Sequence, residues 1–339
     1  MSIKILSDSA CDLSKEIIEE YNIDILPIIV IKGDEEYLDN VTITPKKVYE
    51  DMRNGQTYKT AQIPPNAFSD KFSEYAKNGD SIIYIAFSSG LSGTYQTSLF
   101  VRESILEEYP NFDLDIVDTK AASGGFGLIV LQAAKLAKEG KSKEEILKAI
   151  EFYKENIEHI FTVDDIEYLF RGGRVSRVQA FVGGLLNIKP VLHVADGKLV
   201  PLEKVRGRHK VFKCMLDLME DRTKNANLSE QIIGITHGDD LEGVLKLKEL
   251  ITERFGAEKF VINMIGASIG AHSGPGTIAL FFLRENYEKL KNLKLNKKIF
   301  SYLVFFIIKL WTNINEGSII INVEKNICTF SSVGRATDS

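Results

Sequence analysis

Ser81-Ile-Ile-Tyr-Ile-Ala-Phe87 is an apolar run rich in β-branched residues, and Ser88-Ser-Gly-Leu-Ser-Gly-Thr94 follows it directly. The next residues, Thr94–Glu108, carry apolar side chains at helical spacing, so this region predicts a strand, a loop and a helix. The first half of the chain repeats this alternation, with strands predicted at Ile3–Leu6, Ile23–Ile31 and Leu114–Val117 and helices near Pro45–Arg53 and Gly127–Glu139. We therefore expect an α/β domain, residues 1–160, with a mainly parallel sheet covered by helices.

The pattern changes near Phe161. Two apolar runs, Ile188–Val194 and Leu199–Val205, flank Asp196-Gly197, and such a pair between apolar runs is typical of a β-hairpin. The elements that follow are strands predicted at Ile232–Thr236, Phe260–Met264 and Thr277–Leu283 and a helix near Leu241–Phe255. They predict a second α/β domain, residues 161–285, with a mixed sheet.

Residues 286–339 do not continue this pattern. They begin rich in Lys and Asn, contain the apolar run Ile299–Ile308, and end in the polar segment Ser331–Ser339. The apolar run is too short to span a bilayer, which takes about 20 residues. Because the last residues resemble a reading frame that continues into a transfer-RNA gene, two hypotheses stay open: a native tail, and an extension produced by a frameshift or a lost stop codon.

The composition narrows the class of protein. Lys and Arg number 42 against 47 Asp and Glu, a formal charge of −5, so bulk charge does not favour a nucleic-acid partner. The three cysteines, Cys11, Cys214 and Cys328, lie far apart, which indicates neither a disulfide framework nor a zinc site. The first residues lack the pattern of a signal peptide. We expect a cytoplasmic protein with at most transient membrane contact.

Three runs carry candidate chemistry. Ser88–Thr94 places hydroxyls and backbone N–H groups at a predicted helix start, which suits an anion, although caps and turns are the commoner use of such residues. The glycine-rich run Gly266–Gly276 contains His272 and is expected to be a loop. Basic residues gather in Leu169–Arg177 and around Arg206, at a predicted strand end; solvated surface charges are the alternative for both.

These runs, with Thr60-Ala-Gln62, resemble the DegV family of bacterial fatty-acid-binding proteins over about residues 3–284. The resemblance rests on four motifs that occur in the family's order: Ser88-Ser-Gly-Leu-Ser-Gly-Thr-Tyr-Gln96, Arg171-Gly-Gly-Arg174, Asn187-Ile-Lys-Pro190 and Gly270-Ala-His-Ser-Gly-Pro-Gly276. It implies two α/β domains with a ligand tunnel between them, in which a long-chain fatty acid binds.

The resemblance also implies roles for particular residues. The hydroxyls of Thr60 and Ser92 would bond the carboxylate, with His272 nearby. Some family members carry the lipid for a separate ATP-binding kinase subunit that phosphorylates the carboxylate to an acyl phosphate; Arg206 would then steady the phosphoryl group, and Arg171 is a second candidate for that role or for facing the partner. No catalytic residue, cofactor or metal is expected. Ala61 departs from the family, which often has a small hydroxyl residue there.

Other functions compete with this one. A serine hydrolase is disfavoured because Gly90-Leu-Ser-Gly-Thr94 lacks the second glycine of the G-x-S-x-G elbow. A nucleotide-binding enzyme is disfavoured because Ser123-Gly-Gly-Phe-Gly127 does not match the spacing of a phosphate-binding loop. A lipid carrier or sensor with no link to a kinase stays open.

Overall fold

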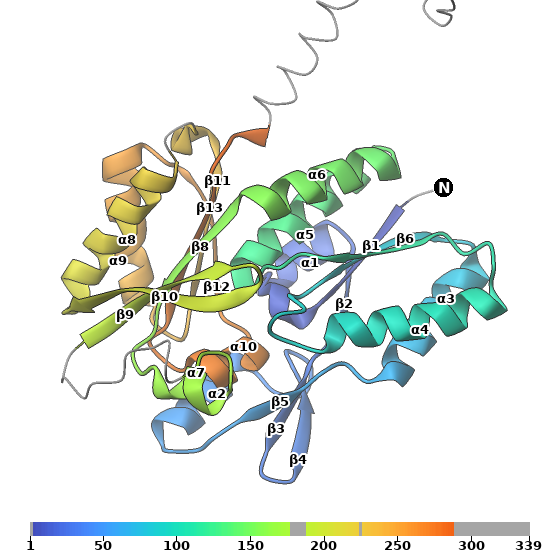
Figure 1. Cartoon of the computed structure of the whole chain (residues 1–339), viewed down its shortest axis with the longest axis horizontal. Helices are drawn as coiled ribbons and strands as arrows, with labels where there is room; N and C mark the ends of the chain where they lie inside the picture. Colours follow the sequence, from blue (N-terminus) through green and yellow to red (C-terminus); the bar gives the residue numbers. More distant parts are fainter. Residues whose placement is uncertain (1–2, 177–187, 224–225, 288–339) are drawn as a thin grey trace, which may run out of the picture. The chain divides into compact units, whose positions relative to one another are not determined.

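The computed structural model describes residues 3–176, 188–223 and 226–287. Its first sheet is entirely parallel and has the strand order β2-β1-β6-β7. The strands are β1 (Ile3–Asp8), β2 (Ile23–Leu26), β6 (Ser81–Ala86) and β7 (Leu114–Asp118). Figure 1 shows α3 (Pro65–Asn78) and α4 (Thr94–Glu108) on the opposite side of this sheet from α5 (Ser123–Lys138) and α6 (Lys143–Asn156). Every residue of β6 is buried, as expected for an inner strand covered on both faces.

The second sheet is mixed and has the order β10-β9-β8-β13-β11-β12. Only β11 and β12 run parallel among its neighbouring strands. The strands are β8 (Ile157–Thr162), β9 (Ile188–Ala195), β10 (Lys198–Arg206), β11 (Ile232–His237), β12 (Lys259–Met264) and β13 (Ile278–Leu283). Side chains of α8 (Arg208–Arg222) and α9 (Leu241–Phe255) form a hydrophobic core with one face of this sheet.

Helix α5 packs against both sheets, contacting β1 of the parallel sheet and β8, β11 and β13 of the mixed one. Its buried residues therefore surround the helix instead of forming one stripe. Two glycines make the close approach possible: a side chain at Gly124 would collide with Phe281, and one at Gly125 would collide with His159. The glycine run that resembled a nucleotide loop in the sequence is thus the first turn of a packed helix.

A third, antiparallel sheet of order β4-β3-β5 lies next to α2 (Pro45–Arg53). Its strands are β3 (Ile29–Lys32), β4 (Glu35–Leu38) and β5 (Lys59–Ala61). The remaining elements are the helices α1 (Lys15–Glu20), α7 (Glu167–Arg171) and α10 (Ala267–Ser273) and the 3-10 turns η1 (Ser9–Cys11) and η2 (Leu228–Glu230). This small sheet matters because β5 carries Thr60.

The predicted fold class, α/β with a parallel and a mixed sheet, is confirmed. The predicted bounds of α2, α4 and α9 are those observed. The single strand predicted at Ile23–Ile31 is wrong: Pro27, which has no N–H for a sheet, separates β2 from β3, and the two strands belong to different sheets. The loop expected at Gly266–Gly276 is also wrong, because it contains α10.

Several elements were not predicted, namely α1, α3, α6, α7, α8, the strand β8 and the three-stranded sheet as a unit. The expected domain boundary at residue 160 falls within β8, which begins at Ile157. Both the hypothesis about the tail and the apolar run Ile299–Ile308 lie outside the described residues. Within the described ranges, none of the helices has the length and apolar character needed to cross a membrane.

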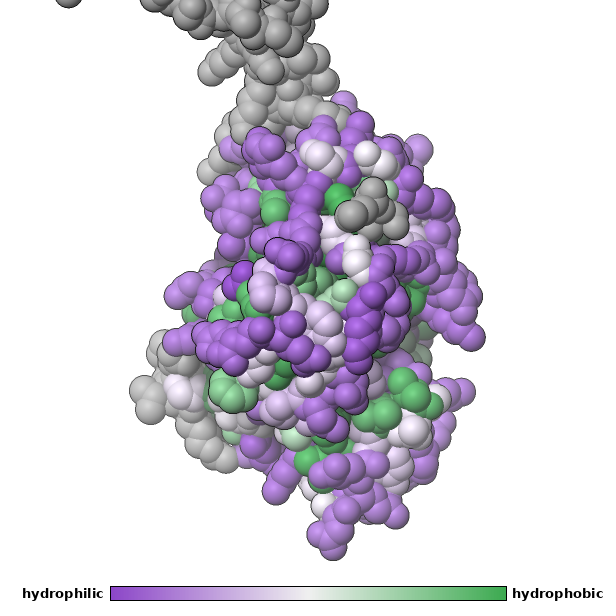
Figure 2. Space-filling model, turned by 90° about the vertical axis from the view of Figure 1, so that its right-hand side faces the viewer, coloured by the Kyte–Doolittle hydropathy of each residue, from purple (hydrophilic) through white to green (hydrophobic). Residues whose placement is uncertain are grey.

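The face shown in Figure 2 is mainly hydrophilic, with separate hydrophobic spots. In the part of the chain that the structure describes, the large apolar side chains exposed to solvent are Leu38, Val41, Phe100, Leu241 and Leu245. Scattered exposed apolar residues are normal on a folded protein. These exposed side chains therefore do not indicate a binding surface, and the apolar surface considered below lines an internal cavity.

The inner strand β6 supplies a test of the fold. Ile83 is fully buried, so Ile83→Ala should lower the free energy of unfolding by about 2–5 kcal/mol through lost burial and the cavity left behind. Val41, which is 67% exposed, is the control: Val41→Ala should change it by less than about 0.5 kcal/mol. Urea denaturation measures both, and equal effects would contradict the packing described.

Candidate functional site

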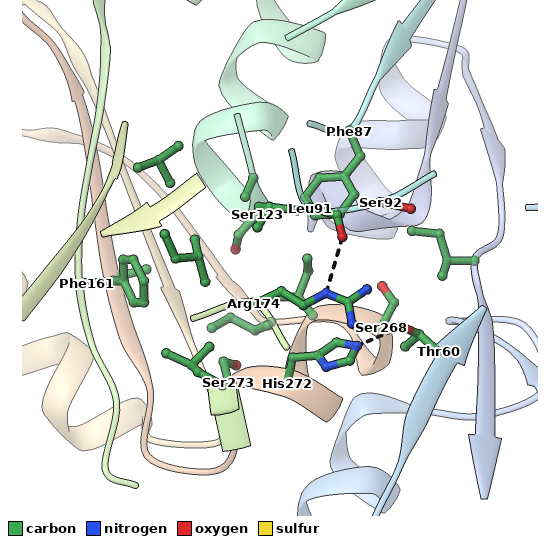
Figure 3. A pocket seen from close by; sticks show the side chains of 18 of the residues that line it. Thr60, Phe87, Leu91, Ser92, Ser123, Phe161, Arg174, Ser268, His272 and Ser273 are labelled. Atoms are coloured by element: carbon green, nitrogen blue, oxygen red, sulfur yellow. Dashed lines mark hydrogen bonds between the residues drawn. The ribbon is translucent and has the colours of Figure 1, made fainter. Parts of the chain in front are cut away.

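A cavity of about 300 Å³ lies where loops and strands of all three sheets meet. Polar groups of Thr60, Ser92, Arg174 and His272 line it, and so do apolar side chains from β8, β9, β10 and β13: Phe161, Val194, Leu199, Ala279 and Phe281. In the view of Figure 3, Thr60 and Ser92 are on one side and Phe161 on the other. The cavity thus has a polar end and an apolar end.

Ser92 reaches the cavity from the loop between β6 and α4. Its Oγ accepts a hydrogen bond from the backbone N–H of Thr94 at 3.3 Å and lies 2.9 Å from Thr94 Oγ1. If the Thr94 hydroxyl is the donor in the second contact, the Ser92 hydroxyl keeps its own proton for a ligand. The next residue is a glycine, Gly93, because Gln62 Oε1 occupies the space that a side chain would need at this position.

Thr60 and His272 meet at the polar end, with Thr60 Oγ1 and His272 Nε2 2.7 Å apart. Burial, with a smaller contribution from the charge of Arg174, lowers the pKa of His272 to about 3. The imidazole is therefore neutral at neutral pH. If its proton is on Nε2, it donates to Thr60, and the threonine hydroxyl is then available to donate into the cavity.

Arg174 lies beside this pair, as Figure 3 shows. Its Nε donates to the carbonyl of Leu91 at 3.2 Å and its Nη1 to the carbonyl of Gly172 at 2.5 Å. Burial lowers its pKa from the ordinary value for arginine. Among the described residues no carboxylate lies within ion-pair distance of this guanidinium, so the cavity contains a cation that lacks a counterion.

Buried aspartates hold the helix that carries His272. Asp39 Oδ1 accepts from the N–H of Ala267 at 2.9 Å, and Asp39 Oδ2 accepts from the Ser268 hydroxyl at 2.5 Å. Asp12 Oδ1 accepts from the N–H of Gly266 at 2.8 Å. Burial outweighs these hydrogen bonds and raises the pKa of Asp12 to about 8 and also raises that of Asp39. The start of α10 is thus tied to two loops that are distant in sequence.

The structure brings together three of the five residues expected at the site: Thr60, Ser92 and His272. The other two lie elsewhere. Arg171 is exposed and stacks on Tyr168 at 4.7 Å, and Arg206 is exposed at the end of β10. Neither lines the cavity.

Sequence reasoning did not single out Arg174, although Arg171-Gly-Gly-Arg174 contains it. Helix α7 ends at Arg171 and the next two glycines turn the chain, so the second arginine of the motif faces inward and the first faces solvent. Ser123, His159 and Ser273 also line the cavity and were not expected there. For Ser123 the available signal was its place at the end of the loop that follows a parallel strand.

Comparisons with known proteins show the family to which the chain belongs. The family described as "Uncharacterised protein, DegV family" matches residues 2–285. The chain belongs to the DegV family. A DegV domain-containing protein of Clostridium perfringens is 44% identical over 287 residues, which cover 84% of this chain and 98% of the relative. One of Caldanaerobacter subterraneus subsp. tengcongensis is 32% identical over 280 residues, 83% and 98% of the two chains.

Solved DegV structures have the same fold. A DegV family protein from Thermus thermophilus, described by its fatty-acid binding, matches with a TM-score of 0.74 and 30% identity over 83% of this chain and 99% of its own. A stearic-acid-binding protein from Eubacterium ventriosum matches with a TM-score of 0.77 and 27% identity over 82% and 97%. These DegV relatives bind fatty acids.

The DegV site described here offers no obvious metal position: within the described ranges, His, Cys, Asp and Glu form no group of three or more that could hold a metal ion. What the site offers a ligand is one cation, several hydroxyls and a neutral imidazole. That set suits an anionic oxygen group.

The neutral state of His272 can be tested in the ligand-free protein. Its pKa of about 3 is below the value of about 6.5 expected in the unfolded chain, so protonation favours unfolding. The stability that His272 contributes should be complete above about pH 6.5 and lost as the pH falls toward 3. Nitrogen-15 NMR, assigned with His272→Gln, should show a neutral ring down to about pH 4; a midpoint between about 6 and 7 would contradict the burial.

Proposed function

We propose that this DegV protein binds one long-chain fatty acid in the cavity, with the carboxylate at the polar end and the acyl chain among the apolar residues. The observation that carries the proposal is the guanidinium of Arg174, which faces the cavity and has no counterion among the described residues. A buried charge is costly unless it is paired. A carboxylate attached to an apolar chain would pair the charge and fill the rest of the cavity.

The acyl chain would supply most of the affinity. A sixteen-carbon acid has about fourteen methylenes, and burying each contributes about 0.8 kcal/mol, or roughly 11 kcal/mol in total. Association costs an estimated 4–15 kcal/mol in lost freedom. The hydrogen bonds to the carboxylate therefore need mainly to offset the cost of removing it from water and to set the direction in which the acid lies.

The head group would be held by donors of different kinds. Arg174 would provide a charge-assisted bond, worth about 1.5–3 kcal/mol. His272 would donate to Thr60 and Thr60 to one carboxylate oxygen, while Ser92 would donate to the carboxylate from the start of α4. In this proposal Arg174 joins Thr60 and Ser92, the two hydroxyl residues that the family resemblance implies, in binding the carboxylate.

The contacts of Ser92 favour binding over hydrolysis. Its hydroxyl pairs with Thr94, whereas His272 pairs with Thr60. A serine nucleophile needs a base within hydrogen-bond reach. Within the described residues no histidine bonds Ser92, so we assign this serine to orienting the ligand.

Replacing Arg174 tests the head-group assignment. Arg174→Gln should weaken the binding of palmitate about 10- to 100-fold, because it removes the charge-assisted bond. Arg171→Gln is the matched control from the same motif, and its side chain is exposed. Isothermal titration calorimetry measures both variants, with thermal melts to confirm folding.

Equal affinities for wild type and Arg174→Gln would contradict the proposed head-group site. A large loss in Arg171→Gln would contradict it as well, because that side chain faces away from the cavity. Ser92→Ala is a further check and should weaken binding by about tenfold.

We further propose that the bound carboxylate is presented in the cytoplasm to a separate ATP-dependent kinase subunit. A carboxylate oxygen would attack the γ-phosphorus of ATP, forming an acyl phosphate and releasing ADP. The exposed guanidinium groups of Arg206 and Arg171 are the candidates to contact the phosphoryl group or the partner. Support comes from the family resemblance and from the exposure of these two side chains.

This finer proposal has its own test. With an ATP-binding subunit that co-purifies with the chain, Arg206→Ala should lower the rate of acyl phosphate formation at least about tenfold, as expected for loss of one charge-assisted contact. The dissociation constant for the fatty acid should not change. Failure to find acyl phosphate with any co-purifying ATP-binding protein would instead support a lipid carrier or sensor.

A further inference from the structure

Ser273 presents to the cavity a buried hydroxyl that has no hydrogen-bond partner among the described residues. The residue is 6% exposed, and its Oγ has no partner in the structure. Among the described residues, Arg102 Nε and Thr162 Oγ1 share this condition, whereas the Arg208 and Asp240 atoms form an ion pair with each other. Neither Arg102 nor Thr162 lines the cavity, but Ser273 does.

Ser273 is placed toward the acyl part of the cavity. It follows His272 at the end of α10, but in Figure 3 it lies on the Phe161 side of His272, and Thr60 lies on the other side. A saturated chain would press methylenes against this hydroxyl and leave it unsatisfied. Buried polar groups without partners are rare in native proteins, so the position needs an explanation.

Ser123 adds a second polar group from another wall of the cavity, at the start of α5. Its Oγ bonds Asp12 Oδ2 at 2.5 Å and Thr236 Oγ1 at 2.9 Å. A serine oxygen can take part in three hydrogen bonds, so one position of Ser123 is still available. Figure 3 shows Ser123 on the same side of Arg174 as Ser273.

The other polar groups near this part of the cavity are engaged. His159 Nε2 accepts from the N–H of Ala122 at 3.2 Å, and burial lowers the pKa of His159 to about 4, so its ring is neutral. The Thr277 hydroxyl donates to the carbonyl oxygens of Ser273 and Gly274. In this part of the cavity, Ser273 therefore offers a hydroxyl proton that no group of the described residues accepts, and Ser123 offers an acceptor position.

We propose that Ser273, supported by Ser123, forms a second polar site in the cavity that recognises a hydroxyl group on the acyl chain. The inference rests on the proposed fatty-acid binding and adds a substrate class: hydroxylated long-chain acids. A chain hydroxyl would bond Ser273 and use the free position of Ser123. A site built to hydrogen-bond a hydroxyl discriminates against the analogue that lacks it.

The test compares stearic acid with a panel of hydroxyoctadecanoic acids that differ in the position of the hydroxyl. At least one isomer should bind the wild-type protein about tenfold more tightly than stearic acid, which corresponds to one good hydrogen bond. Ser273→Ala should weaken the binding of that isomer and tighten the binding of stearic acid, so that the preference disappears.

Thr162→Val is the matched control. Thr162 also has a buried hydroxyl without a partner, but it does not line the cavity. The variant should leave the ratio of the two affinities unchanged. A change in that ratio equal to the change in Ser273→Ala would overturn the inference.

Two negative outcomes have different meanings. If stearic acid binds but no isomer is preferred, or if Ser273→Ala keeps the preference, the second polar site is wrong and fatty-acid binding stands. If neither stearic acid nor any isomer binds, the proposed function fails and this inference fails with it.

Discussion

The hydrogen bonds that buried aspartates make to the start of α10 are the interaction on which the site depends. Asp12 lies shortly after β1 of the parallel sheet, and Asp39 directly follows β4 of the small antiparallel sheet, yet both bond the backbone of residues 266–268. Thr60, Ser92 and His272 come from three different parts of the fold. This attachment, together with the packing of α10 against α2 and the small sheet, holds His272 Nε2 2.7 Å from Thr60 Oγ1.

This arrangement has an electrostatic consequence. Asp12 and Asp39 are buried, and burial raises the pKa of each, while His272 is held neutral by burial and by Arg174. Arg174 is the cation that faces the cavity, and no carboxylate of the described residues lies within ion-pair distance of it. The proposed binding of an amphipathic anion in a single direction depends on this combination of one cation, neutral donors and an apolar extension.

Much of the fold could be predicted from the sequence because apolar periodicity and turn residues are local signals. The bounds of α2, α4 and α9 and the hairpin at Asp196-Gly197 follow from such signals. The helix α10 could not be predicted, because its small residues look like a glycine-rich loop until the packing of Tyr49 against Gly270 is known; five of them are buried, namely Ala267, Ser268, Gly270, Ala271 and Ser273. Tertiary contacts therefore determine that α10 is a helix.

The site residues also divide into those that the sequence could identify and those that only the structure could. Thr60, Ser92 and His272 could be named from motifs, and the structure places all three at one cavity. Arg174 could not be separated from Arg171, because only the turn at Gly172 and Gly173 decides which guanidinium faces inward. Ser273 could not be recognised at all, since a hydroxyl without a partner is visible only when every neighbour is placed.

Native mass spectrometry of the purified full-length protein tests the central claim most directly. We predict one bound molecule with the mass of a long-chain fatty acid, released by organic solvent, or one molecule bound when such an acid is added to stripped protein. A protein that carries no lipid and takes up none of the added acids would contradict the account.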